Sequence, residues 1–389
     1  MSGPLARPLG LLGLLAAMIT FALAAPATGL AASSAVAIGV NVENGPGDGK
    51  ALDAWKQTVG RDPAVVMWYQ SFAEPLFYST QLPDVAKRGA VPLITWMPQQ
   101  GATGVPLTDI AAGKWDAYLV DSAKQAKAWG KPIMIRFGHE MNLAGAPYGP
   151  GRQGNSAALF VSAWRHVVQV FRTAGATNVR WVWTPNVDCD GKCPFTAFYP
   201  GDAYVDWVGL DGYNTGSMPD SPGWRSLASV FGSSYDQLTR LTTKPVMIAE
   251  TASTEGGGDK AAWIRNAFAT DLPQRLPKVR LVVWFDRRKE TDWRVDSSAA
   301  SLAAFKQAMA AAASFAVDPS VVQAAAPAPA PAVAPATSTT APASTGARTT
   351  APALVVAPLT TASAKLRTRG RASRPRLRVG SVRLARGGR

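Results

Sequence analysis

Short apolar segments recur along the central part of the chain and alternate with longer segments of mixed polarity. Eight of them are rich in β-branched or aromatic residues and end at a polar, glycine or proline residue, which is typical of β-strands. Because these segments carry few polar positions, we expect strands that are buried on both faces of a parallel sheet. The predicted strands are 36–40, 64–69, 91–97, 132–137, 179–184, 205–210, 246–249 and 281–285.

Several segments between the predicted strands have the period of an amphipathic helix. In 157–173, apolar residues such as Phe160, Trp164 and Phe171 fall on one side, and Gly175 provides a stop. Helices are also predicted over 117–129, 261–269 and 301–313. Eight strands that alternate with helices over about 290 residues predict a (β/α)8 barrel, or TIM barrel. A doubly wound open sheet is the alternative, but no G-x-G-x-x-G nucleotide-binding motif follows the first strand.

The net charge of the chain is concentrated near its C-terminus. The 389 residues contain 40 Lys and Arg against 26 Asp and Glu, a formal charge of +14. Residues 324–389 hold eleven of the basic residues and no acidic one, whereas residues 35–323 hold 28 basic and 26 acidic residues. This nearly neutral central part removes the main reason to expect nucleic-acid binding.

The N-terminal segment 1–32 is predicted to be a secretory signal peptide. It has a basic start at Arg7, a long apolar stretch and then small residues, with an Ala-x-Ala pattern at 22–24. The alternative is an uncleaved membrane anchor, because the apolar stretch approaches the length that spans a bilayer. We therefore expect a secreted, extracellular protein.

The C-terminal residues have the composition of a linker followed by a tail. Segment 316–363 is rich in Ala, Pro and Thr, which favours an extended linker without a packed core. Segment 364–389 alternates Arg with small and apolar residues and is predicted to be a basic disordered tail. Its charge could also hold the protein against an anionic cell-envelope surface.

The two cysteines of the chain, Cys189 and Cys193, lie close together in a turn-rich segment. Because export permits disulfides, we expect a local disulfide between them. We expect no metal site, because the chain has only two His residues and no second cysteine pair.

Polar residues follow the predicted strands at the end of the barrel where active sites form. Glu140 stands shortly after the fourth strand and Glu250 directly after the seventh. We expect these strands on opposite sides of the ring, so that the two carboxyl groups face each other across its mouth. A pair about 5–5.5 Å apart can hydrolyse a glycoside with retention, because one carboxylate attacks the anomeric carbon while the other carboxyl protonates the leaving oxygen.

Other residues at the strand ends could assist this pair. Arg136 points the same way as Glu140 by strand alternation, so we expect it to be a buried supporting partner. Asp211, at the end of the sixth strand, is assigned a supporting role, with a substrate contact as the alternative. The aromatic residues expected at the rim, where flat faces stack on sugar rings, are Trp96, Trp183, Tyr213 and Trp284.

Three sequence motifs resemble those of glycoside hydrolase family 26. IRFGHEMN at 135–142 resembles the fourth-strand signature of that family, VDWVGLDGYN at 205–214 its sixth strand, and KPVMIAET at 244–251 its nucleophile strand. The resemblance implies that residues 35–315 form a single (β/α)8 catalytic domain of a retaining endo-glycosidase. That family contains β-mannanases, with related β-1,3-1,4-glucanases and β-1,3-xylanases.

The resemblance also implies roles for individual residues. Glu140 would be the general acid/base and Glu250 the nucleophile, with Tyr213 near the nucleophile. His139 and Trp284 would lie in the subsite that holds the attacked sugar. The family pattern implies no cofactor.

One segment departs from the family pattern. Many members follow His-Glu-Met-Asn with Gly and then a Trp-x-x-Trp-Gly-like stretch, whereas residues 143–149 contain no Trp. Tyr148 would have to replace that aromatic residue, and the adjacent Asn142 is a further candidate substrate contact. The predicted function is a secreted monomer that hydrolyses β-1,4-mannan. The alternatives are a mixed-linkage β-1,3-1,4-glucanase, an enzyme that trims an exopolysaccharide, and a non-catalytic carbohydrate-binding barrel.

Overall fold

The computed structural model describes residues 36–311. The predicted signal peptide, linker and basic tail, at 1–32, 316–363 and 364–389, lie outside the described residues and remain predictions. Within 36–311, none of the helices has both the length and the apolar character needed to cross a membrane.

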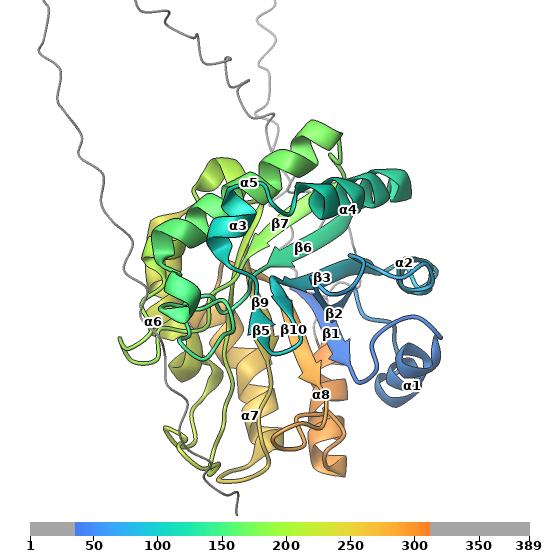
Figure 1. Cartoon of the computed structure of the whole chain (residues 1–389). Helices are drawn as coiled ribbons and strands as arrows, with labels where there is room; N and C mark the ends of the chain where they lie inside the picture. Colours follow the sequence, from blue (N-terminus) through green and yellow to red (C-terminus); the bar gives the residue numbers. More distant parts are fainter. Residues whose placement is uncertain (1–35, 312–389) are drawn as a thin grey trace, which may run out of the picture. The chain divides into compact units, whose positions relative to one another are not determined.

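Eight parallel strands close into a barrel in which strands that follow each other in the chain are neighbours in the ring (Figure 1). The first and last strands pair to complete it. The predicted (β/α)8 fold is confirmed, and each predicted strand is present with its ends shifted by no more than two residues. The barrel strands are β1 (Ala37–Val42), β2 (Val65–Ser71), β3 (Val91–Met97), β6 (Ile133–Phe137), β7 (Val179–Trp183), β8 (Trp207–Asp211), β9 (Val246–Thr251) and β10 (Val279–Asp286).

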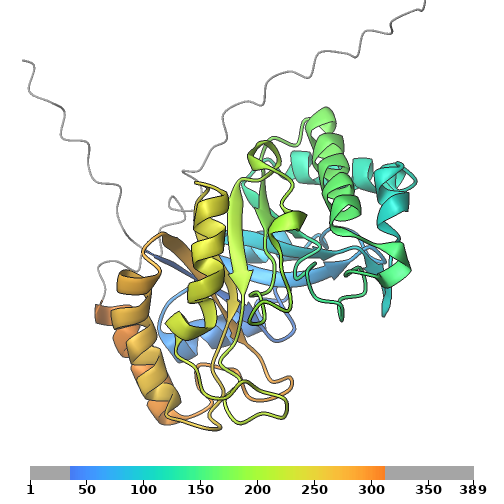
Figure 2. The same cartoon turned by 90° about the vertical axis from the view of Figure 1, so that its left-hand side faces the viewer.

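Helices surround the barrel, with α4 beside α5 and α7 beside α8 (Figure 2). A two-stranded antiparallel ribbon, β4 (Gln99–Gln100) and β5 (Thr103–Gly104), follows β3. The helices are α1 (Lys50–Val59), α2 (Gln81–Ala86), α3 (Leu107–Ala111), α4 (Asp116–Trp129), α5 (Ala157–Ala174), α6 (Leu227–Leu241), α7 (Lys260–Asn266) and α8 (Ala299–Ala311). Short 3-10 turns lie at Arg152–Gly154, Thr196–Phe198 and Asp202–Tyr204, and a π-helical segment at Ala267–Arg275 extends α7.

The predicted helices are present, and α5 illustrates why they form where they do. The Ser156 side chain accepts a hydrogen bond from the Leu159 backbone and caps the first turn. Gly175 ends the helix in the left-handed conformation, with φ 77°. The apolar side that includes Phe160 and Trp164 is fully buried against the barrel.

Alternate strand residues point into the barrel or out toward the helices. Met67, Leu93, Met134 and Met247 belong to the inner cluster that fills the barrel. The alternate residues join the larger apolar layer between the strands and the helices. Because side chains fill the interior, the strand ends are where a site can open.

Candidate active site

A cleft of about 550 Å³ opens where the barrel strands end. Four of the residues singled out in the sequence line it together: His139, Glu140, Tyr213 and Glu250. The other residues that line it are Tyr69, Met97, Leu143, Asn186, Thr215, Met218, Phe285, Arg287, Lys289, Glu290 and Trp293. The carboxyl ends of the strands therefore bring together side chains that are far apart in the sequence.

A larger hollow, of about 920 Å³, lies between α4 and α5 on the outer side of the barrel. His166 lines it, and its Nε2 lies 2.6 Å from Asp116 Oδ1, so this histidine joins the two helices. No strand end reaches this hollow and Asp116 is the acidic residue on its wall. We therefore assign the candidate chemistry to the cleft at the strand ends.

A β-bulge aims Glu250 into the cleft. The pairing of β9 with β8 passes from Ile248 to Glu250 while β8 advances by one residue. The pairing with β10 passes from Ile248 to Thr251 while β10 advances by two residues. One extra residue in β9 therefore interrupts the alternation, and Ala249 and Glu250 both face inward.

Two donors hold the buried carboxylate of Glu250. Arg136 donates from Nη2 to Oε1, and Tyr213 donates from its hydroxyl to Oε2 at 2.6 Å. Burial alone would raise the pKa of Glu250, but the positive charge of Arg136 and these hydrogen bonds lower it to about 2. Glu250 is therefore charged at neutral pH.

Arg136 lies beneath the cleft and is completely buried. It donates from Nη1 to both oxygens of Asp211 at 2.8 Å, and from Nε and Nη2 to Thr95 Oγ1 at 2.9 and 2.7 Å. The guanidinium thus contacts Asp211, Thr95 and Glu250 from inside the barrel. These bonds fix its position and the orientation of the Glu250 carboxylate.

Glu140 occupies a sharp turn just beyond β6 rather than an extension of the strand. Its φ is 53°, in the left-handed region that non-glycine residues seldom adopt, and its backbone N–H donates to the Thr184 carbonyl at 2.9 Å. Gly138, with φ 53°, shares the turn, and a Cβ there would lie 3.0 Å from the Phe160 ring. The turn directs the Glu140 carboxyl into the cleft, where Asn186 Nδ2 donates to Oε1 at 2.7 Å.

The two carboxyl groups have different proton affinities because their surroundings differ. Burial, reinforced by the negative charge of Glu250, raises the pKa of Glu140 to about 7. Near neutral pH the pair therefore consists of one charged carboxylate, Glu250, and one carboxyl group that can carry a proton, Glu140. Acid-assisted displacement at a sugar carbon requires such a pair.

His139 stands beside the pair as a neutral side chain. Burial, and then the positive charge of Arg136, lower its pKa to about 3. Its ring is 5.7 Å from the Tyr69 ring, and its Nδ1 lies 3.1 Å from the Tyr148 hydroxyl. Tyr148 also donates to the His139 carbonyl at 2.8 Å.

The three tryptophans expected at the rim of the barrel do not line the cleft. Trp96 points outward from β3 and packs against Phe72 and Phe171, with ring centroids 4.8 and 5.8 Å away. Trp183 packs against the rings of Phe195 and Tyr199, and Trp284 against those of Trp263 and Phe305. The prediction was wrong for Trp96, Trp183 and Trp284 because all three lie on the outward side of their strands, where they are fully buried.

Asn142 and Tyr148 are also misassigned as substrate contacts, because both are buried behind the cleft wall. Tyr148 supports His139 from behind. Asn142 connects two loops by hydrogen bonds to Asn186 and Cys193. The aromatic side chains that do line the cleft are Tyr69, Tyr213, Phe285 and Trp293.

The expectation that the fourth and seventh strands lie on opposite sides of the ring was also wrong. β7 and β8 separate β6 from β9, so the two strands are three positions apart. The carboxyl groups still line one cleft because Glu140 leaves the strand direction at its turn and Glu250 leaves it at the bulge. The predicted disulfide between Cys189 and Cys193 is present, with Cα atoms 5.2 Å apart.

Among the described residues, no group of three or more His, Cys, Asp and Glu side chains is arranged to hold a metal ion. The buried carboxyl groups of Asp211 and Glu250 both pair with the Arg136 guanidinium.

Known proteins share the sequence and fold of this barrel. Endoglucanase H of Acetivibrio thermocellus is 37% identical over 289 residues, which are 72% of this chain and 31% of that protein. A mannan endo-1,4-beta-mannosidase of Bacillus subtilis is 31% identical over 163 residues, which are 40% of this chain and 41% of that protein. The chain therefore spans less than half the length of either relative.

Solved structures share the fold at lower sequence identity. A modular endo-beta-1,4-mannanase from Cellulomonas fimi superposes with a TM-score of 0.56 at 21% identity, covering 77% of this chain and 76% of that one. The YdhT protein from Bacillus subtilis gives 0.52 at 22% identity, covering 70% and 85%. The family model for glycosyl hydrolase family 26 matches residues 113–274, which include Glu140 and Glu250. Over residues 113–274, which this model matches, the chain has the sequence of glycosyl hydrolase family 26.

Proposed function

We propose that this protein is a retaining endo-β-glycosidase that hydrolyses a β-linked polysaccharide. The observation that carries the proposal is the pairing of Glu140 and Glu250 in one cleft, with pKa values of about 7 and about 2. Such a difference divides the acid and nucleophile roles between two chemically identical groups.

The reaction follows from the state of each carboxyl group. The Glu250 carboxylate attacks the anomeric carbon and forms an ester as the glycosidic C–O bond breaks, while Glu140 gives its proton to the leaving oxygen. Glu140, now charged, takes a proton from water, and the water oxygen attacks the same carbon and displaces Glu250. Two displacements at one carbon give net retention.

The neighbouring groups prepare this chemistry. Arg136 and Tyr213 keep Glu250 charged and fix both of its oxygens. The amide of Asn186 can only donate to Oε1 of Glu140, so the transferable proton resides on Oε2. Tyr69, Tyr213, Phe285 and Trp293 offer flat apolar surfaces to sugar rings.

We propose β-1,4-mannan as the substrate, because several curated relatives are named mannan endo-1,4-beta-mannosidases. A β-glucan is the second candidate, favoured by the 37% identity to a protein named an endoglucanase, which covers 72% of this chain. A reducing-sugar assay on mannan, glucomannan, lichenan, laminarin and β-1,3-xylan distinguishes the two. A binding-only barrel would release no sugar from any of them.

Two variants test the mechanism. Glu250→Gln should abolish nearly all turnover on every substrate, because the neutral amide cannot form the ester. Glu140→Gln should slow the natural polymer far more than an aryl glycoside with a good leaving group, which needs little acid assistance. Wild-type activity in Glu250→Gln, or net inversion in the products followed by NMR, would refute the proposal.

We also propose that the protein is secreted and held at an anionic surface by residues 324–389, whose eleven basic residues are not offset by any acidic one. Fractionation of producing cells should find the full chain with the envelope. A chain that ends at residue 323 should be found in the medium with unchanged hydrolysis. Equal distribution of the two forms would contradict the role of the tail.

A further inference from the structure

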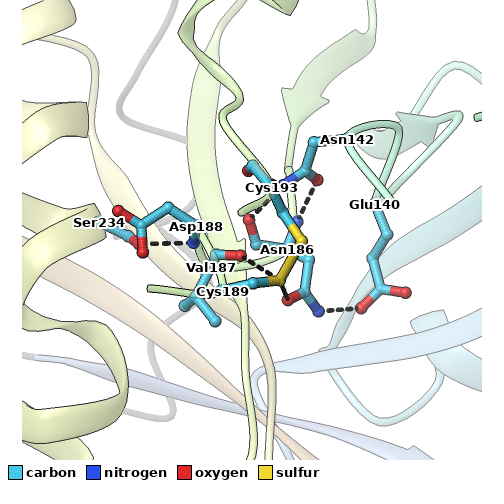
Figure 3. The surroundings of a disulfide bond; sticks show 8 residues. All are labelled: Glu140, Asn142, Asn186, Val187, Asp188, Cys189, Cys193 and Ser234. Carbon is cyan, nitrogen blue, oxygen red and sulfur yellow. Dashed lines mark hydrogen bonds between the residues drawn. A yellow bond between two sulfur atoms is a disulfide. The ribbon is translucent and has the colours of Figure 1, made fainter. Parts of the chain in front are cut away.

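The Glu140 carboxyl depends on one amide for its orientation. Within residues 36–311, Asn186 is the side chain that hydrogen-bonds to it, through Nδ2 and Oε1 at 2.7 Å (Figure 3). Asn186 follows β7, 46 residues further along the chain. Whatever positions this amide therefore also positions the Glu140 carboxyl.

Asn142 connects the loop of Glu140 to the loop of Asn186. Its Oδ1 accepts from the Asn186 backbone N–H at 2.9 Å, and its Nδ2 donates to the Asn186 carbonyl at 3.0 Å. The same Nδ2 donates to the Cys193 carbonyl at 2.8 Å. Asn142 is buried, so these bonds face little competition from water. Figure 3 shows it beside Asn186 and Cys193, joined to both by hydrogen bonds.

The disulfide between Cys189 and Cys193 borders the same amide. Cys189 Sγ lies 3.9 Å from Asn186 Oδ1 and 3.4 Å from the Val187 carbonyl oxygen. A disulfide sulfur carries no hydrogen, so these are packing contacts. The sulfur covers the oxygen side of the amide, and the nitrogen side faces Glu140 (Figure 3).

The backbone between Cys189 and Cys193 adopts an unfavourable conformation that cross-links stabilise. Cys189, Asp190 and Gly191 all have φ in the left-handed region, at 53°, 56° and 84°. Two of these residues have side chains, for which that conformation is unfavourable. The disulfide and the Cys193 N–H to Asp188 carbonyl bond, at 2.8 Å, close the loop around them.

The far end of the loop is anchored to α6. The Asp188 backbone N–H donates to Ser234 Oγ at 2.9 Å, and Gln237 Nε2 donates to Asp188 Oδ2 at 2.5 Å. The disulfide loop therefore has one fixed end on a helix and the other on Asn142, beside Glu140.

We propose that the Cys189–Cys193 disulfide and Asn142 are positioning elements for Glu140, acting through the Asn186 amide. The inference rests on the proposed function, in which Glu140 is the general acid. A disulfide that closes so short a segment restricts the unfolded chain less than one that closes a long segment. Its main effect is therefore on the local arrangement, and the step that suffers without it is proton donation.

The test separates a loss of proton donation to the leaving group from a general loss of activity. The double variant Cys189→Ser/Cys193→Ser is compared with wild type on two substrates: unsubstituted oligosaccharides of the glycan that the wild type hydrolyses, and the matching 2,4-dinitrophenyl glycoside. We expect kcat/KM on the oligosaccharide to fall about tenfold or more, part of the 10²–10⁴-fold that a general acid contributes. We expect little change in kcat/KM on the activated glycoside, because this ratio reports the first step, in which 2,4-dinitrophenolate leaves without acid assistance. Lys192→Ala, an exposed residue inside the same loop, keeps the disulfide and should match wild type.

If the double cysteine variant folds poorly, two further measurements still test the inference. Asn142→Ala should give the same selective loss, and adding it to the double variant should cost little more. Wild-type protein treated with a phosphine reductant should lose oligosaccharide activity selectively and regain it on reoxidation. Equal losses on both substrates, or no loss, would overturn the inference. A wild type that cleaves neither substrate would instead refute the proposed function.

Discussion

The same substitution, glutamate to glutamine, is expected to change stability in opposite directions at Glu140 and at Glu250. The pKa of Glu140 is raised from 4.5 to about 7 by burial and by the charge of Glu250. The contribution of this carboxyl to stability is therefore full below pH 4.5 and is lost as the pH rises through about 7. The pKa of Glu250 is lowered from 4.5 to about 2, since Arg136 outweighs the opposing effect of burial. Its contribution is therefore present above pH 4.5 and lost as the pH falls toward 2.

The magnitude follows from the distance of each pKa from 4.5. At about 1.36 kcal/mol per pKa unit, each change corresponds to roughly 3 kcal/mol. Glu140 is only half-buried, and solvent screening therefore reduces the stability change expected for Glu140 to about 2 kcal/mol. At pH 8, Glu140→Gln should therefore raise the free energy of unfolding by about 2 kcal/mol, because it removes a charge that the site disfavours. Glu250→Gln should lower it by about 3 kcal/mol, because it removes the charged form of Glu250 that Arg136 and Tyr213 stabilise in the folded state.

Urea unfolding of wild type and both variants at pH 4, 6 and 8, followed by circular dichroism, measures these changes. The gain in Glu140→Gln should shrink toward zero at pH 4, and the loss in Glu250→Gln should shrink only below pH 4.5. A gain in Glu140→Gln that does not vary with pH would refute the electrostatic reasoning, as would shifts of the same sign in both variants at pH 8.

Three further predictions concern activity and packing. The kcat/KM of the wild type should fall above pH 7, because burial and the charge of Glu250 raise the pKa of Glu140 to about 7; a fall beginning near pH 5 would contradict this assignment. Tyr213→Phe removes the 2.6 Å hydrogen bond to Glu250 and should lower kcat/KM about ten- to hundredfold, since a bond to a charged group contributes about 1.5–3 kcal/mol; unchanged kcat/KM would exclude the contact from the reaction. Trp96→Ala should lower the free energy of unfolding by about 3–5 kcal/mol with unchanged KM, because Trp96 is buried outside the cleft. Trp293→Ala, in the cleft wall, should raise KM instead, and the reverse result for the two tryptophans would contradict their placement.

The barrel could be predicted from the sequence because each strand is a continuous apolar segment. The same continuity hides which side of a strand faces inward. In β10, Trp284 and Phe285 are equally apolar neighbours, yet Phe285 reaches the cleft and Trp284 packs against α8. Ionisable residues mark the inward side in some strands, as Arg136 does in β6 and Asp211 in β8, but no such residue does so for β3.

The acidic pair could be predicted from its place after two strands, whereas its surroundings could not. Asn186 stands after β7 in a segment with no distinguishing pattern, and its amide reaches Glu140 through a loop that only the fold brings near. Tyr69 lies inside β2 after the continuous apolar run Val65–Trp68, and nothing in that run indicates which of its residues face inward. Trp293 lies on a loop of charged residues beyond β10, where no strand or helix periodicity predicts which way its side chain points.

The extra residue in β9 makes the placement of Glu250 depend on a count of residues rather than on their identity. Ala249 faces the inner cluster, and another small residue could occupy its place. Without the bulge, regular alternation from Ala249 would turn the Glu250 carboxylate toward the helices, whereas removing Ala249 would leave it facing inward but one residue deeper in the barrel. Insertions and deletions in this segment are thus more harmful than substitutions. A β9 segment grafted from another barrel would preserve the nucleophile only if it brought its own bulge at the same position.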